Sequence, residues 1–179
     1  HRGYLNRSNT LDTGSSGLRY NFGMSLSSAG HRLIVADYER NQLFEYSLSN
    51  YSSTRSNVSL SLRQKSNSSY SSSNGYFARP IDAAYDSSGN IYATDLYNHR
   101  IQKFNSSLVY QAKVGTYSTS SGFRNPYGMH IDSSDNIYVT DYYNYAVRKY
   151  DTSLTETATY GGGAGTRLDV AKKVIKQIV

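Results

Sequence analysis

The sequence predicts an all-β fold of about three β-propeller blades, each of four antiparallel strands, in a partial ring with a short C-terminal α-helix. A long segment is repeated, because Gly89–Phe104 (GNIYATDLYNHRIQKF) returns as Asp135–Tyr150 (DNIYVTDYYNYAVRKY). Each copy alternates short β-branched and aromatic runs with polar turn residues, as antiparallel strands do. A period of about 40 to 50 residues with four short strands is typical of a propeller blade.

The repeat extends beyond these two segments and predicts the strands of each blade. Arg79–Leu108 aligns with Asn125–Leu154, and a weaker copy covers Phe22–Ser49. Short apolar strands are separated by turns such as Asp-Ser-Ser-Gly-Asn, because Asp and Asn bond to nearby backbone and Gly accepts a positive φ. After the strands that end at Asp95 and Phe104, a fourth strand is expected in each copy. The three fourth strands are predicted at Val58–Arg63, Val109–Gly115 and Thr155–Tyr160.

The repeats divide the chain into four parts. We predict a polar N-terminal segment (1–19), blades at 20–76, 77–122 and 123–160, a glycine linker (161–165) and an amphipathic helix (166–179). A serine-rich insertion at 47–76 lengthens the first blade. Thr166 and Asp169 have capping-box spacing, and the apolar stripe that follows is expected to pack on the propeller or on a neighbouring domain. The helix also resembles the first helix of a von Willebrand factor A domain, although the Asp-x-Ser-x-Ser motif that precedes such a helix is missing.

The motif Pro-x-Gly-φ-x-φ-Asp of the third copy (Pro126–Asp132) and the segment Asp95–Phe104 (DLYNHRIQKF) of the second copy resemble the NHL repeat, and the resemblance covers about residues 20–160. The first copy departs from it at Arg40, where the second copy has Asn98, and the third copy has YNYAVRKY for YNHRIQKF. The resemblance implies a propeller that usually has six blades. We therefore expect other blades from the same parent chain or from a second subunit, because an open arc exposes apolar faces.

Charge and composition exclude several function classes. The net charge is +6, but the tail from Thr166 contributes +3, and Ser16–Tyr160, with 13 basic and 11 acidic residues, contributes only +2. A near-neutral body argues against nucleic acid as a partner. Cysteine is absent, which excludes disulfides and thiolate chemistry. No apolar run is long enough to span a bilayer. The composition, rich in Ser, Tyr and Asn, favours an extracellular or cell-surface location.

No catalytic residue, metal site or cofactor is expected. The four histidines are His1, His31, His99 and His130. They lack the spacing of a zinc pair. The repeated Asp37, Asp95 and Asp141 are interpreted as turn caps that accept backbone N–H bonds. Leu11–Gly17 (LDTGSSG) resembles an aspartic protease motif, but the second Asp motif that this chemistry needs is missing. The NHL resemblance leaves a metal-dependent lyase of the peptide-amidating type as an alternative.

The candidate binding site lies in the loops between second and third strands and in the connections between blades. These loops share one face of a propeller, and they carry the Tyr, His and Arg that recur in binding surfaces. The predicted binding residues are Tyr38, Arg40, Arg79, Tyr97, His99, Arg124, Tyr142, Tyr143 and Tyr145. We therefore predict a non-catalytic binding, adhesion or scaffold module of a larger protein, with a protein or glycan ligand. An RNA- or protein-binding regulatory domain is the alternative.

Overall fold

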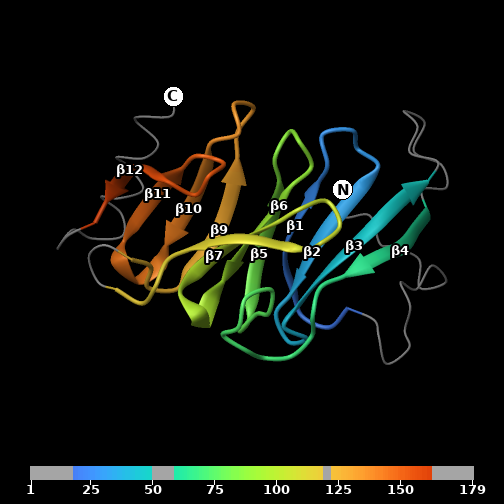
Figure 1. The fold of residues 1–179 in the computed structure, drawn as a ribbon, viewed down its shortest axis with the longest axis horizontal. Coiled ribbons are helices and arrows are strands. Elements are labelled where there is room, and N and C mark those ends of the chain that lie inside the picture. Colours follow the sequence, from blue (N-terminus) through green and yellow to red (C-terminus); the bar gives the residue numbers. More distant parts are fainter. Residues whose placement is uncertain (1–17, 50–58, 119–121, 163–179) are drawn as a thin grey trace, which may run out of the picture.

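The computed structural model describes residues 18–49, 59–118 and 122–162, which form three four-stranded antiparallel sheets (Figure 1). The first comprises β1 (Asn21–Leu26), β2 (Arg32–Asp37), β3 (Gln42–Ser49) and β4 (Ser59–Lys65). The second comprises β5 (Pro80–Tyr85), β6 (Ile91–Asp95), β7 (Arg100–Phe104) and β8 (Tyr110–Val114). The third comprises β9 (Pro126–Ile131), β10 (Ile137–Asp141), β11 (Ala146–Tyr150) and β12 (Glu156–Gly161). The predicted fold of propeller blades is confirmed.

The three sheets, here called blades 1, 2 and 3, lie side by side as an arc (Figure 1). In each blade the strands follow one another in sequence order, so the first and fourth strands form its two edges. The first strand of blade 2, β5, contacts both β1 and β9. The first strands therefore gather along the inner edge of the arc, and the fourth strands lie at its outer edge.

Apolar cores fill the spaces between neighbouring blades. Ile34 and Leu43 of blade 1 pack with Ile91 and Phe104 of blade 2, and all four are essentially buried. A second core joins blade 2 to blade 3 through side chains such as Ile101, which is also fully buried. Alternation along each strand places one set of side chains against the preceding blade and the next set against the following one. Neighbouring blades therefore stabilise one another through these shared cores, and blade 1 adds a cluster of its own around Phe44.

The repeated aspartates accept backbone N–H bonds, as predicted, but they do more than cap a turn. Asp95 is fully buried and accepts a bond from the N–H of Ala78, which precedes the first strand of its own blade, at 2.7 Å. The N–H groups of Arg19 and Arg124 bond in the same way to Asp37 and Asp141. Each carboxylate thus ties the entry of its blade to the end of the second strand.

The fourth strands of blades 2 and 3 begin one residue later than predicted, at Tyr110 and Glu156, while the predicted first residue of β4, Val58, lies outside the described residues. Each pairing with the third strand contains a register shift. A bulge adds a residue to one strand, so sequence alternation alone misplaces its ends.

Several predicted segments fall partly or wholly outside the described residues. These are most of the N-terminal segment (1–19), most of the glycine linker (161–165) and the helix (166–179). Within the predicted serine-rich insertion, β4 is a regular strand, and the backbone carbonyls of Ser72 and Ser73 bind Arg100 of blade 2. The described part of the chain contains no helix that is long and apolar enough to cross a membrane.

Candidate ligand-binding face

Six aromatic side chains form a continuous row along one face of the arc. We call them the aromatic row: Tyr97, Tyr38, Phe22, Tyr127, Tyr142 and Tyr143. Five of the six keep 40 to 52% of their surface exposed, and Tyr38 is half-buried. The row draws on all three blades, so it exists only when the blades are assembled.

Contacts between the side chains fix the row. The hydroxyls of Tyr38 and Tyr97 lie 3.3 Å apart, and the rings of Tyr38 and Phe22 meet edge to face with centroids 5.4 Å apart. The Phe22 and Tyr127 centroids lie 6.5 Å apart and join blade 1 to blade 3. Tyr142 then contacts Tyr127 at 5.9 Å. The three distances between ring centroids are within the usual range for aromatic pairs.

The local backbone explains why these rings reach the surface together. Tyr142 and Tyr143 lie in a short 3-10 turn, η2 (Tyr142–Asn144), which directly follows buried Asp141. Tyr97 lies in the matching turn of blade 2, η1 (Leu96–Asn98). The residues that end these turns adopt a left-handed conformation, which reverses the chain into the third strand. Exposed tyrosines are therefore held on rigid turns anchored by a buried carboxylate.

Two arginines cover rings of the row. The Arg79 guanidinium carbon lies 4.7 Å from the Tyr38 ring centroid, and Arg79 also donates to the Tyr38 carbonyl at 3.3 Å. Arg124 lies 5.4 Å from the Tyr143 centroid. Both distances suit cation–π contact. Neither arginine forms an ion pair with a carboxylate of the described residues. The face therefore combines aromatic surface with positive charge that no described acidic group neutralises.

The other predicted residues are His99, Arg40 and Tyr145, and His99 lies at the connection between blades 2 and 3. His99 ends η1, its Nδ1 accepts a bond from the Asn125 N–H at 3.2 Å, and its ring contacts Tyr117. Burial lowers the pKa of His99 below its usual 6.5, and the charge of Asp141 partly opposes this shift. A neutral imidazole is the form that can accept this bond. His99 thus supports the connection between blades 2 and 3.

Tyr145 and Arg40 lie in the connections between the second and third strands of blades 3 and 1. Tyr145 is half-buried and ends η2, at the position that His99 occupies in blade 2. Arg40 gives its backbone N–H to Asp37 at 3.0 Å. Its Nε is buried and has no hydrogen-bond partner among the described residues. The structure therefore groups six of the nine predicted residues, the four tyrosines of the turns and the two ring-covering arginines.

Phe22 and Tyr127, which join the two halves of the row, were not predicted from the sequence. Both lie near the start of a first strand, directly before Gly23 and Gly128. The two tripeptides Phe22-Gly23-Met24 and Tyr127-Gly128-Met129 match, but this match indicates only a shared blade pattern. The matching residue of the second copy is Ile81, which is buried, so the repeat gave no sign of an exposed ring.

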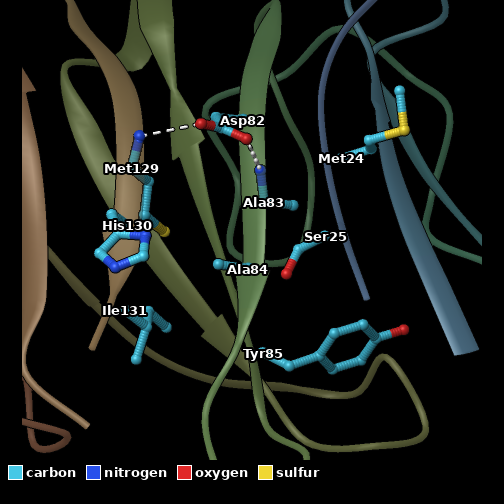
Figure 2. A pocket seen from close by; sticks show the side chains of 9 residues that line it. All are labelled: Met24, Ser25, Asp82, Ala83, Ala84, Tyr85, Met129, His130 and Ile131. Carbon is cyan, nitrogen blue, oxygen red and sulfur yellow. Dashed lines mark hydrogen bonds between the residues drawn. The ribbon is translucent and has the colours of Figure 1, made fainter. Parts of the chain in front are cut away.

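A small open pocket lies between the first strands at the inner edge of the arc (Figure 2). Its volume is about 170 Å³. Small-molecule sites usually measure about 300 to 1,000 Å³. Asp82 lines it, at the position where the other copies have glycine, and its two oxygens accept the N–H groups of Ala83 and Met129, both at 2.9 Å. Burial raises the pKa of Asp82, which these hydrogen bonds partly oppose.

Asp82 also explains a glycine of the neighbouring blade. A Cβ at Gly23 would collide with the Asp82 carboxylate, so β1 approaches β5 closely only because glycine stands there. The pocket is therefore a packing site in which both carboxylate oxygens are already bonded. Among the described residues, no three His, Cys, Asp or Glu side chains gather as a metal cluster.

Comparison with known proteins supports an NHL-repeat propeller. Residues 77–104 match the family model of the NHL repeat. No curated protein matches the chain. The chain is similar to Kuenenia stuttgartiensis hydrazine synthase, with 13% identity and a TM-score of 0.60, covering 92% of this chain and 41% of that one. It is also similar to a streptogramin B lyase structure, with 14% identity and a TM-score of 0.54, covering 82% of this chain and 41% of that one. The chain thus spans about two fifths of the length of each of these two structures.

Proposed function

We propose that this chain is a non-catalytic binding or adhesion module of a larger, extracellular or cell-surface protein, and that the aromatic row is its ligand-binding face. One observation carries the proposal: six aromatic rings from three blades form a continuous exposed row flanked by Arg79 and Arg124. A few residues dominate the binding energy of a protein interface, and Trp, Tyr and Arg are enriched among them. The adhesive role and the location outside the cell rest on composition.

The row is preorganised for binding. Its rings already contact one another, and the arginines already cover two of them, so little side-chain freedom remains to be lost. Binding by groups that are ordered beforehand costs less free energy. An extended surface of this kind suits a protein or a glycan chain better than a small molecule. The guanidinium groups favour a ligand that carries an acidic group. Other blades, from the parent chain or a second subunit, would lengthen this face.

A catalytic role has weaker support. Both similar structures have enzyme names, but identities of 13% and 14% show a shared fold and transfer no activity. His99 already accepts a backbone hydrogen bond, and Asp82 accepts two. An RNA-binding role has one observation in its favour, because exposed aromatic rings beside arginine can stack on bases. The salt dependence of binding separates that alternative from adhesion, because phosphate binding weakens steeply as salt rises.

The test compares a face variant with a matched control. Tyr97→Ala combined with Tyr142→Ala removes a ring from each half of the row, while Val109→Ala truncates an exposed apolar side chain at the opposite end of blade 2. Fluorescently labelled proteins are incubated with intact cells of the organism that encodes the chain, and bound protein is measured by flow cytometry. We expect the double variant to lose at least about tenfold in affinity, since one hot-spot residue contributes more than about 1 kcal/mol.

Pretreatment of the cells identifies the ligand class. Trypsin removes protein ligands, and periodate oxidises glycans. The far-ultraviolet circular dichroism of all variants should match that of the wild type, which shows that the blades remain folded. If the double variant binds as tightly as the control, the aromatic row is not the binding face.

A further inference from the structure

The chain has 19 tyrosines and no cysteine, so a covalent link between its blades cannot be a disulfide. Tyrosine offers a different link. When two phenol rings each lose one electron and one proton, they can couple through the ring carbons next to their hydroxyls and form dityrosine. Such coupling requires two tyrosines whose hydroxyl ends meet.

Tyr38 and Tyr97 meet in this way at the junction of blades 1 and 2. Their hydroxyl oxygens lie 3.3 Å apart, although the two residues are separated by 59 positions in the sequence. Tyr38 directly follows β2 of blade 1, and Tyr97 lies in η1 of blade 2. The coupling carbon of each ring is bonded to the carbon that carries the hydroxyl. Contact between the hydroxyls therefore brings the coupling carbons close together.

Neighbouring residues hold both rings in this position. The Tyr38 ring meets Phe22 edge to face, and the Arg79 guanidinium carbon lies 4.7 Å from its centroid. The backbone N–H of Tyr97 donates to the Ala78 carbonyl at 3.0 Å, which fixes η1 on the entry of blade 2. Groups that are held together in this way react much faster than groups that must find each other.

The pair is accessible and is specific to this junction. Tyr97 is 47% exposed and Tyr38 is half-buried, so an oxidant reaches the pair from solvent. In blade 2 the residue that matches Tyr38 is Leu96, which is buried and has no phenol to couple. Tyr127 and Tyr142 also contact each other, but both belong to blade 3, so a link between them would join no blades.

We propose that Tyr38 and Tyr97 are an oxidative cross-linking site, at which hydrogen peroxide and a peroxidase join the two rings as dityrosine and lock blade 1 to blade 2. Each phenol gives up one electron and one proton, and the two radicals form one carbon–carbon bond. Each coupled carbon then loses its hydrogen as a proton to its own oxygen, which restores both hydroxyls. The two electrons and two protons reduce one hydrogen peroxide to two waters. The site does not depend on the ligand-binding role.

Peroxidase treatment of the dilute full chain tests the proposal. Trypsin releases Leu33–Arg40, in which Tyr38 is the one tyrosine. It also releases Ser66–Arg100, which contains Tyr97 and four other tyrosines, because trypsin does not cut before Pro80. We expect mass spectrometry to find these peptides joined at Tyr97 and two hydrogen atoms lighter than the separate pair. In an equal mixture of isotope-labelled and unlabelled protein, both linked peptides should carry the same label, as a link within one chain requires.

Two conservative variants separate the effect of contact from that of exposure. Tyr97→Phe keeps the ring but removes the hydroxyl, so the yield of linked peptide should fall at least about tenfold. Tyr70→Phe is the matched control, because Tyr70 lies on the same tryptic peptide and is more exposed, at 60% against 47%. It should leave the yield unchanged. A Leu33–Arg40 peptide that stays unlinked, or that links through Tyr70 or to a second copy, overturns the proposal.

The stability of the linked protein gives a second readout. A link across 59 positions restricts the unfolded chain, as a disulfide does. We expect oxidation to raise the urea midpoint of the wild type and to leave that of Tyr97→Phe unchanged. An equal rise in both proteins would show that this pair does not lock the blades. Circular dichroism of Tyr97→Phe that matches the wild type confirms that the variant is folded before oxidation.

Discussion

Asp95 shows how one buried side chain organises a blade. It is fully buried, and its carboxylate accepts a hydrogen bond from the backbone N–H of Ala78. The same carboxylate accepts a second hydrogen bond from Arg100 Nε at 2.7 Å. Burial raises the pKa of Asp95, and its hydrogen bonds oppose this shift. Arg100 also donates to the Tyr76 carbonyl, so the ion pair holds the connection from blade 1 in place. Breaking such a buried pair costs about 3 to 5 kcal/mol, because one charge stays buried without a partner.

The sequence could predict this aspartate but not its cation. In blade 3 the same role falls to Asp141 and Arg148, and Arg148 is the third residue of its strand, whereas Arg100 is the first of its own. Both positions bring a long guanidinium back to the same carboxylate. A repeat alignment compares equal positions, so it detects the aspartate and misses a partner that changes place.

At His99 the structure predicts a dependence of stability on pH. The pKa of His99 is lowered in the folded protein, so below the usual 6.5 the unfolded chain binds protons that the folded chain does not. Its contribution to stability is therefore complete above pH 6.5 and is lost as the pH falls through the folded pKa. We expect urea unfolding to show that the stability of wild type relative to His99→Gln decreases from pH 7.5 to pH 5. A constant difference between the two proteins would contradict the assignment of a neutral His99.

At the scale of elements, the strand pattern was predictable and the joining of blades was not. The repeat predicted strands that end at Asp95 and Phe104, which are the observed ends of β6 and β7, because one face of each strand must be buried. The aromatic row crosses blade boundaries through Phe22 and Tyr127. Which side chains meet there depends on the packing of whole blades, and a single repeat contains no information about its neighbour. This is why four tyrosines of the row were predicted and its central pair was missed.

Thr94 is a link between strands that can be tested by itself. Its Oγ1 accepts the N–H of Asp82 at 3.0 Å and donates to the Tyr127 carbonyl, so it joins β6 to β5 and to blade 3. Thr94→Val keeps the shape but leaves both groups without this partner. We expect it to lower the free energy of unfolding by about 1 to 3 kcal/mol in urea titrations. Thr157→Val is the matched control, since Thr157 is exposed and bonds only weakly to Lys149. Equal effects of both substitutions would show that Thr94 does not join the blades.

At the scale of the whole molecule, the distribution of charge separates the candidate functions. The +6 net charge is concentrated toward the tail, and Ser16–Tyr160 carries only +2. Most arginines of the blades have acidic partners, including the buried pairs of Arg100 and Arg148. The aromatic row, by contrast, has Arg79 and Arg124 close to its rings. A face with two such cations can bind an acidic group, but it cannot hold a long phosphate backbone at many points.

This difference predicts how binding responds to salt. A protein that neutralises six to ten phosphates loses about 10³- to 10⁵-fold in affinity between about 50 and 200 mM salt, because bound counterions are released. Two arginines correspond to a loss of only about tenfold over the same range. We therefore expect cell binding to weaken by no more than about tenfold, and a fluorescent oligouridylate to bind weakly at 200 mM salt. The opposite outcome is tight oligouridylate binding that falls steeply with salt and is lost in the Tyr97→Ala/Tyr142→Ala variant. That result would assign the aromatic row to single-stranded RNA, because base stacking on tyrosine would then supply the affinity that two cations do not.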